Sequence, residues 1–119
     1  MNLEKIFKVL GDGNRLRILN LLMRGELCVC EIEGILGLSQ TNVSRHLGRL
    51  SAAGIIDSRK NAQWVFYRIN DDFGREHVSL AKYLEASFGA DRACRRDSVK
   101  LKKNKKALVA GRIEQCRQV

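Results

Sequence analysis

Cys28 and Cys30 are the residues of this 119-residue chain whose types and spacing are best suited to chemistry. Thiolates prefer soft ions, so a Cys-x-Cys pair favours As(III), Sb(III), Cd(II) or Pb(II) over hard cations such as Mg(II). Such a pair also occurs as two small buried side chains that bind nothing, and the spacing alone leaves this interpretation open. No segment is apolar enough for a signal peptide or a membrane span, so we expect a cytoplasmic protein whose cysteines stay reduced.

The spacing of the two cysteines has a conformational consequence. Side chains two residues apart point about 200° apart around an α-helix, at roughly 100° per residue, whereas in an extended segment they share one face. Two sulfurs on a regular helix therefore cannot easily hold one small ion. We expect residues 28–30 to be non-helical, or to become so when a ligand binds, which would tilt the next helix and displace residues 40–45.

Hydrophobic spacing predicts the elements that position this pair. Apolar residues at helical spacing, with glycines as stops, indicate short helices, and Asp12 and Ser39 are expected as N-caps. After Gly54 the hydrophobic period changes to two, which indicates a β-hairpin. The helices are expected at residues 3–10, 13–24, 30–37, 39–53 and 73–88, and the hairpin at 55–69. The fold class is therefore mainly α with a small β-hairpin.

The net charge of +9 is unevenly distributed along the chain. Residues 1–90 contain 12 basic and 10 acidic side chains, a net of +2, whereas residues 91–119 contain 10 basic and 3 acidic ones, a net of +7. We therefore place a boundary near residue 90, between a folded domain (1–90) and a basic C-terminal tail (91–119). The tail either assists binding to nucleic-acid phosphates or is a solvated extension.

The order of the expected elements is that of a winged helix-turn-helix. In this arrangement the second helix of the pair enters the major groove, and the hairpin, or wing, reaches flanking phosphates. No Asp or Glu occurs from Leu38 to Gly54, which favours a DNA-facing surface over a merely solvated one. Amide and guanidinium groups there can read adenine and guanine. The candidate DNA contacts are Ser39, Gln40, Thr41, Asn42, Ser44, Arg45, His46 and Arg49 on the helix, and Arg59, Lys60 and Gln63 on the wing.

Residues 3–90 resemble the ArsR/SmtB family of winged-helix metalloregulators. Four segments carry the resemblance: Leu10-Gly-Asp-Gly-Asn-Arg-Leu-Arg-Ile18, Glu26-Leu-Cys-Val-Cys-Glu-Ile32, Leu38-Ser-Gln-Thr-Asn-Val-Ser-Arg-His-Leu47 and Trp64-Val-Phe-Tyr-Arg68. The resemblance implies a homodimeric repressor, joined through its first and last helices, that leaves a palindromic operator in double-stranded DNA when a toxic metal or metalloid binds. The apolar stripes of those two helices agree, because a small domain would otherwise expose them.

The resemblance also bears on the inducer. Arsenic-sensing members carry a Cys-Val-Cys sequence at the position of Cys28 and Cys30, which implies As(III) as arsenite or methylarsenite, with Sb(III) as a further candidate and no organic cofactor. The third cysteine of the family pattern is replaced here by Glu33. A three-sulfur site would then take Cys94 as its tentative third ligand, ahead of Cys116, whereas two thiols suffice for methylarsenite.

The residues also bear on other interpretations of the cysteines. A zinc site of the family's type is disfavoured because the last helix offers only His77 near Asp71 and Asp72, and the family's cadmium and lead type needs a cysteine before Cys28. A repressor of the same fold that responds to thiol oxidation, or to Cd(II) or Pb(II), stays open. An enzyme is not expected, because no phosphate-binding loop or nucleophile turn accompanies the cysteines. It would use Cys28 and Cys30 as a redox pair, or Cys94 beside Arg92, Arg95 and Arg96 as an activated thiolate.

Overall fold

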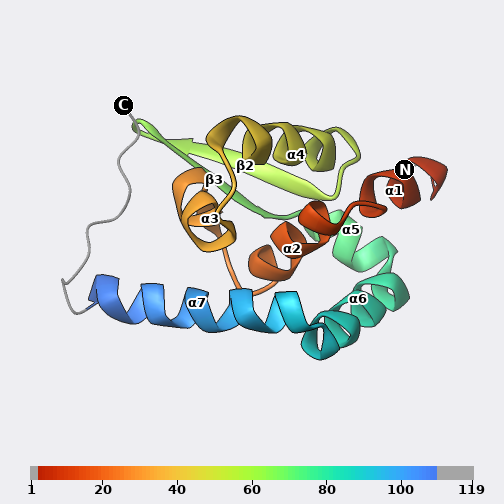
Figure 1. The fold of residues 1–119 in the computed structure, drawn as a ribbon. Helices are drawn as coiled ribbons and strands as arrows, with labels where there is room; N and C mark the ends of the chain where they lie inside the picture. The colour runs from red at the N-terminus through yellow and green to blue at the C-terminus, as the bar shows by residue number, and fades with distance from the viewer. Residues whose placement is uncertain (1–2, 110–119) are drawn as a thin grey trace.

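The computed structural model describes residues 3–109, which form seven helices and one small sheet (Figure 1). The elements are α1 (Leu3–Leu10), α2 (Gly13–Leu22), β1 (Leu27–Cys28), α3 (Val29–Leu36), α4 (Gln40–Ala52), β2 (Ile56–Asn61), β3 (Trp64–Ile69), α5 (Asp71–Glu76), α6 (Val78–Ala90) and α7 (Arg92–Val109). This confirms the predicted fold class. Within the described residues, no helix is both long enough and apolar enough to cross a membrane.

The predicted helix caps are confirmed in the structure. The Asp12 carboxylate accepts hydrogen bonds from the backbone N–H groups of Asn14 and Arg15, at 2.9 and 3.1 Å, at the start of α2. Ser39 Oγ accepts one from the Asn42 N–H at 3.2 Å and so begins α4. These side chains satisfy N–H groups that have no partner inside the helix. Gly37, with φ 68°, ends α3 in the left-handed conformation that favours glycine.

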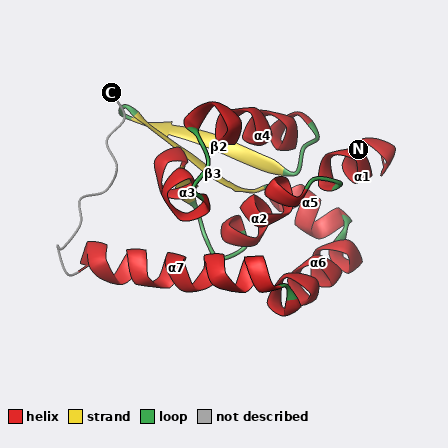
Figure 2. Cartoon of the chain, in the orientation of Figure 1, coloured by secondary structure: helices red, strands yellow, loops and turns green. Residues whose placement is uncertain are grey.

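The sheet is antiparallel, with strand order β1-β3-β2. Its two long strands form the predicted hairpin, which runs beside α4 (Figure 2). The short strand β1 was not predicted. It pairs Leu27 with Tyr67 and Cys28 with Phe66. The segment that holds the first cysteine of the pair is therefore fixed to the wing.

The core lies where α2, α3 and α4 pack together. Ile18 and Leu19 of α2, Ile32 of α3 and Leu47 of α4 have no exposed surface. Full burial of a side chain of this size contributes about 1.5–3 kcal/mol. A helix as short as α3 needs such packing to be stable. The core therefore sets the angle between α3 and α4.

The C-terminal part of the fold differs from the prediction in two ways. The expected helix at 73–88 is interrupted at His77, whose φ of −122° and ψ of 49° separate α5 from α6. Residues 92–109, expected as part of a tail, form α7, which packs on α2, α3 and α6 (Figure 1). Cys94, Asp97 and Leu101 of α7 are buried. Their i, i+3, i+7 spacing is a helical stripe that the charge count obscured.

A polar network fixes α7 to α2. The Arg17 guanidinium donates two hydrogen bonds to the Asp97 carboxylate, from Nε at 2.8 Å and from Nη2 at 2.9 Å. Asn20 Nδ2 donates to the Cys94 carbonyl and to Ser98 Oγ, each at 3.1 Å. Asp97 is almost fully buried, so its charge is tolerated because Arg17 pairs with it.

Candidate functional site

The two cysteines meet at the junction between β1 and α3. Cys28 is the N-cap of α3 and has extended backbone angles, whereas Cys30 lies in the first turn of the helix. Their sulfurs are 3.7 Å apart. Two thiolates about 2.3 Å from one tetrahedral metal lie about 3.8 Å apart. The pair therefore has the spacing of two ligands on a single soft ion, and only Cys28 needs to be non-helical to reach it.

The two thiols differ in their surroundings. Cys28 is fully buried, and this burial raises the pKa of its thiol above the usual value. Its backbone N–H donates to the Glu31 carboxylate at 3.1 Å, which fixes the start of α3. Cys30 is half-buried. An ion that binds both sulfurs therefore reaches them from the side of Cys30, when both cysteines are reduced.

The structure does not bring Cys94 to this pair. Cys94 is a free thiol of α7, buried near α2, and burial beside the Asp91 carboxylate raises its pKa to about 12. Among the described residues, no three His, Cys, Asp or Glu side chains are grouped to hold a metal. The ring of His77 instead lies 5.5 Å from that of Phe73. Cys116 lies outside the described residues.

Most of the predicted DNA contacts on α4 share one exposed face. Val43, Leu47 and Leu50 are fully buried and fix the opposite side of the helix. Asn42 is half-buried and accepts a hydrogen bond from Arg45 Nη2 at 2.5 Å. This bond holds a guanidinium at the start of the helix, where base contacts of helix-turn-helix proteins are made. The exposed predicted contacts are Ser39, Gln40, Thr41, Ser44, Arg45 and Arg49.

His46 differs from the other predicted contacts. It is only 9% exposed, and its Nδ1 lies 3.2 Å from Arg15 Nη1. Arg15 is itself buried and donates from Nε to the Val9 carbonyl at 2.5 Å. The side chain of His46 therefore connects α4 to α2 and the end of α1. Helical spacing placed His46 among polar neighbours of α4. This local pattern could not reveal that Arg15, 31 positions away in the sequence, covers the ring.

Acidification is expected to weaken the fold through His46. Burial lowers the pKa of His46, so the folded protein takes up this proton at a lower pH than the unfolded chain, whose histidine pKa is about 6.5. The stabilisation is complete above that value and is lost as the pH falls through the folded pKa. Urea denaturation at decreasing pH should show a falling free energy of unfolding, and His46→Gln should flatten this decline. An equal decline in the variant would assign it to other groups.

All three predicted contacts of the wing are exposed, and one of them, Arg59, also forms an ion pair. Lys60 and Gln63 are exposed near the turn. Arg59 donates from Nε and Nη2 to both carboxylate oxygens of Glu26, at 2.8 and 2.6 Å. Its guanidinium carbon also lies 4.8 Å from the centre of the Phe66 ring. The pairing with Arg59 lowers the pKa of Glu26. Glu26 was not predicted as a functional residue.

These contacts connect the wing to the cysteine pair. Glu26 lies two residues before Cys28, and Cys28 is opposite Phe66 in the β1–β3 pairing. Phe66 is in turn opposite Arg59 in the β2–β3 pairing. A displacement of Cys28 would therefore move the wing, because the strand pairing and the Glu26–Arg59 ion pair connect them. The sequence predicted only the route through α3 to α4, because an ion pair 33 positions apart has no local signal.

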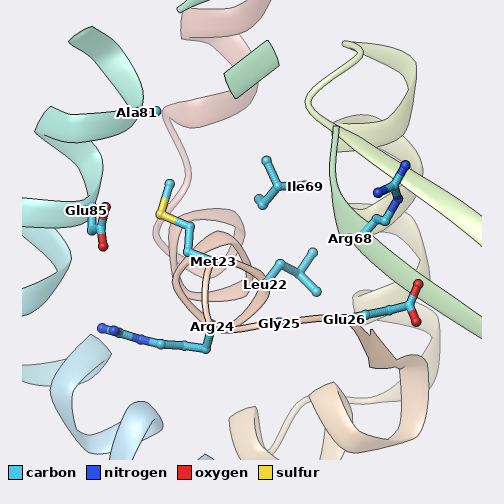
Figure 3. Close-up of a pocket in the computed structure, with 9 residues that line it drawn as sticks. All are labelled: Leu22, Met23, Arg24, Gly25, Glu26, Arg68, Ile69, Ala81 and Glu85. Carbon is cyan, nitrogen blue, oxygen red and sulfur yellow. The ribbon is translucent and has the colours of Figure 1, made fainter. Parts of the chain in front are cut away.

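A groove lies beside the segment that leads into the cysteine pair (Figure 3). It is lined by Leu22, Met23, Arg24, Gly25, Glu26, Arg68, Ile69, Ala81 and Glu85. Glu26 is paired with Arg59, and the Arg68 guanidinium lies 3.8 Å from Asp57 and 3.6 Å from Asp71. The charges of Glu26 and Arg68 are therefore matched within the protein.

Comparisons with known proteins agree with this arrangement. Residues 12–58 match the family described as bacterial regulatory protein, arsR family. The chain is 48% identical over 68 residues to the arsenic resistance transcriptional regulator ArsR1 of Pseudomonas putida, covering 56% of this chain and 53% of ArsR1. It is 37% identical to the arsenic resistance transcriptional regulator ArsR2 of the same organism, over 76% of this chain and 82% of ArsR2. A homodimeric winged helix-turn-helix domain from Mycobacterium bovis superposes with a TM-score of 0.61 at 28% identity, over 75% of this chain and 83% of that one.

Proposed function

Because this chain belongs to the ArsR family of transcriptional repressors, which are not enzymes, we propose that it is a repressor released from operator DNA by trivalent arsenic. As arsenite or methylarsenite, the arsenic would bind Cys28 and Cys30. A homodimer would bind the operator through α4 and the wing. The observation that carries the proposal is the 3.7 Å separation of the two sulfurs at the first turn of α3. Regulators of arsenic resistance and of cadmium resistance are both among the relatives, which supports a soft metal or metalloid as the inducer.

The exposed apolar side chains support the homodimer. Leu3 and Phe7 of α1 are 60% and 55% exposed, and Tyr83 of α6 is 68% exposed. Large apolar side chains left exposed on two helices favour a protein contact. In a two-fold dimer the same patch serves both subunits, so α1 and α6 can supply a self-complementary interface.

The binding step would replace oxygen ligands by sulfur. Each of Cys28 and Cys30, once reduced, loses its thiol proton and forms one As–S bond. Two hydroxyl groups of arsenite leave with those protons as two waters. The third position of the arsenic keeps a hydroxyl, or a methyl group in methylarsenite, so two thiols complete the exchange. No third cysteine is required.

The cysteine pair lies where a small movement of α3 would change the position of α4. Cys28 caps α3, and α3 is followed within three residues by α4. A bridge between the two sulfurs would hold the first turn of α3, and with it the angle between α3 and α4, in one position. If the DNA-bound and the arsenic-bound protein prefer different angles between α3 and α4, each ligand lowers the protein's affinity for the other. Arsenic binding would then release the DNA.

The test of this function is release of DNA by metals and metalloids. Fluorescence anisotropy of a labelled duplex from upstream of the protein's own gene would be measured under reducing conditions against arsenite, methylarsenite, Sb(III), Cd(II) and Zn(II). We expect release by the arsenicals at the lowest concentrations. An Arg45→Gln/Arg49→Gln variant should lose DNA binding while still binding arsenite. Release by Cd(II) before any arsenical would contradict the arsenic assignment.

A thiol-redox switch is the second candidate. The observation that favours it is the 3.7 Å separation of the Cys28 and Cys30 sulfurs, with Cys30 only half-buried. Peroxide oxidises an accessible thiolate, and the resulting disulfide could displace α3 without any metalloid. Release by peroxide that dithiothreitol reverses, with no response to arsenite, would favour this candidate over the first.

Glu26→Gln is expected to weaken the arsenic response without weakening arsenic binding. The substitution removes the ion pair through which Cys28 and the wing are connected. Because the pair is partly exposed, its loss should reduce the arsenite-induced change in DNA affinity only about two- to fivefold. The measurement is the ratio of DNA dissociation constants with and without arsenite, beside the stoichiometry of bound arsenic. An unchanged ratio would mean that arsenic binding affects DNA binding only through α3 and α4.

A further inference from the structure

The exposed charges of α7 are all of one sign. Its only acidic residue, Asp97, is buried and paired with Arg17. Every basic side chain of the helix that the structure describes is exposed, and these are Arg92, Arg95, Arg96, Lys100, Lys102, Lys103 and Lys105. The helix therefore presents a continuous positive surface, although it is part of the folded domain and not a loose tail.

The largest group of these basic side chains lies on the side of α7 that faces away from α4. Cys94, Asp97 and Leu101 point toward α2 and α3, and α4 lies beyond those two helices (Figure 1). A shallow groove lies on the opposite side of α7. It is lined by five basic residues, Val99 and Ala90. We call this group the outer face; its basic residues are Arg92, Arg95, Arg96, Lys100 and Lys103. A duplex held by α4 lies on the other side of the same subunit from the outer face.

We propose that the outer face of α7 binds a second segment of duplex DNA, so that one repressor holds two segments together. The inference rests on the proposed function, because α4 must hold the first segment. From Arg92 to Lys103 the helix rises about 16 Å at 1.5 Å per residue, about the axial length of five phosphates of one DNA strand. Charge complementarity along that length carries the proposal.

The distribution of apolar residues favours DNA over a membrane. A helix that binds a lipid surface needs an apolar side that enters the bilayer. The apolar side of α7 is already buried against α2 and α3, and Val99 is the only large apolar side chain exposed on its described part. The outer face therefore suits a hydrated polyanion.

The variant that tests the proposal is Arg96→Gln/Lys103→Gln in the full chain. Both side chains are exposed on the outer face, and glutamine keeps a good helix propensity. The matched control is Arg75→Gln/Lys82→Gln, which removes the same charge from exposed positions on α5 and α6. Circular dichroism and mass by light scattering would establish that fold and oligomeric state are unchanged.

The measurement is capture of a second duplex. The protein is first saturated with an immobilised duplex, and a labelled duplex of unrelated sequence is then added at increasing salt. We expect capture by the native chain and the control, and at least a tenfold loss in the outer-face variant, which still binds the immobilised duplex. The salt slope of second-duplex binding should fall by about 2, one unit for each phosphate contact removed.

The possible failures are distinguishable. If the native chain binds no duplex at all, the proposed function fails. If it binds one duplex and captures no second, or if the variant captures as much as the control, only this inference is overturned. Equal binding of vesicles containing phosphatidylglycerol, or of polyglutamate of matched charge, would overturn the choice of DNA. Loss of the dimer in the variant would overturn it as well, because the outer face would then be a subunit contact.

Discussion

Replacing Cys28 by serine is expected to raise the arsenite concentration needed for half-release of DNA by about 100-fold or more. The two sulfurs are held 3.7 Å apart, so the second As–S bond forms within the protein and benefits from a high effective concentration. Serine leaves one sulfur and removes that advantage. Cys30→Ser should have the same effect. The measurement is anisotropy of labelled DNA during arsenite titration, in dithiothreitol-free buffer after prior reduction.

Cys94→Ala is the matched control for the two serine variants. Cys94 is buried, its thiol pKa is raised to about 12, and it lies apart from the pair, so the variant should respond to arsenite as the native chain does. The substitution removes one buried sulfur and should cost about 1 kcal/mol of stability, which a urea titration would measure. A folded Cys94→Ala variant that no longer responds would point to a three-sulfur site. Full responses in both serine variants would exclude the Cys28–Cys30 pair.

The local features of the site could be predicted because they depend on neighbouring residues. Asp12 and Ser39 cap the helices expected of them, since each cap bonds to groups two or three positions away. The prediction that residues 28–30 are non-helical is correct for Cys28 alone. A cap residue is extended although its neighbour is helical, so the boundary of α3 places Cys28 and Cys30 together without unwinding the helix. The boundary of α3, predicted one residue late, decides this geometry.

The features that could not be predicted depend on contacts between distant residues. His46 is polar and lies among DNA-facing neighbours, yet Arg15 covers it from α2. Glu26 begins one of the segments that resemble the family, yet its contact with Arg59 arises only because β1 and β2 both pair with β3. Charge counting made residues 91–119 a tail, because a count cannot distinguish Asp97, buried against Arg17, from a solvated acid. In each case a long-range ion pair or hydrogen bond determines the placement.

Arg17→Met is expected to cost about 3 kcal/mol of stability, the largest loss among single substitutions considered. The change leaves the Asp97 carboxylate, whose side chain is 2% exposed, buried without its partner. Breaking one side of a buried ion pair costs about 3–5 kcal/mol, and the partial exposure of Arg17 places this case at the lower end. For a domain of this size the midpoint of thermal unfolding should fall by about 10 °C or more. Differential scanning calorimetry would measure the loss.

The double variant Arg17→Met/Asp97→Leu distinguishes the ion pair from the packing of α7. If the cost of Arg17→Met comes from the unpaired carboxylate, replacing that carboxylate by an apolar group should restore most of the lost stability. The two residues are in contact, so the double-mutant cycle should show a clear coupling between them. If the double variant were as unstable as the single one, the stability of the α2–α7 contact would depend on the shape of the arginine and not on its charge. The outer face of α7 would then be held in place by packing alone, and Arg17 would have no electrostatic role in positioning it.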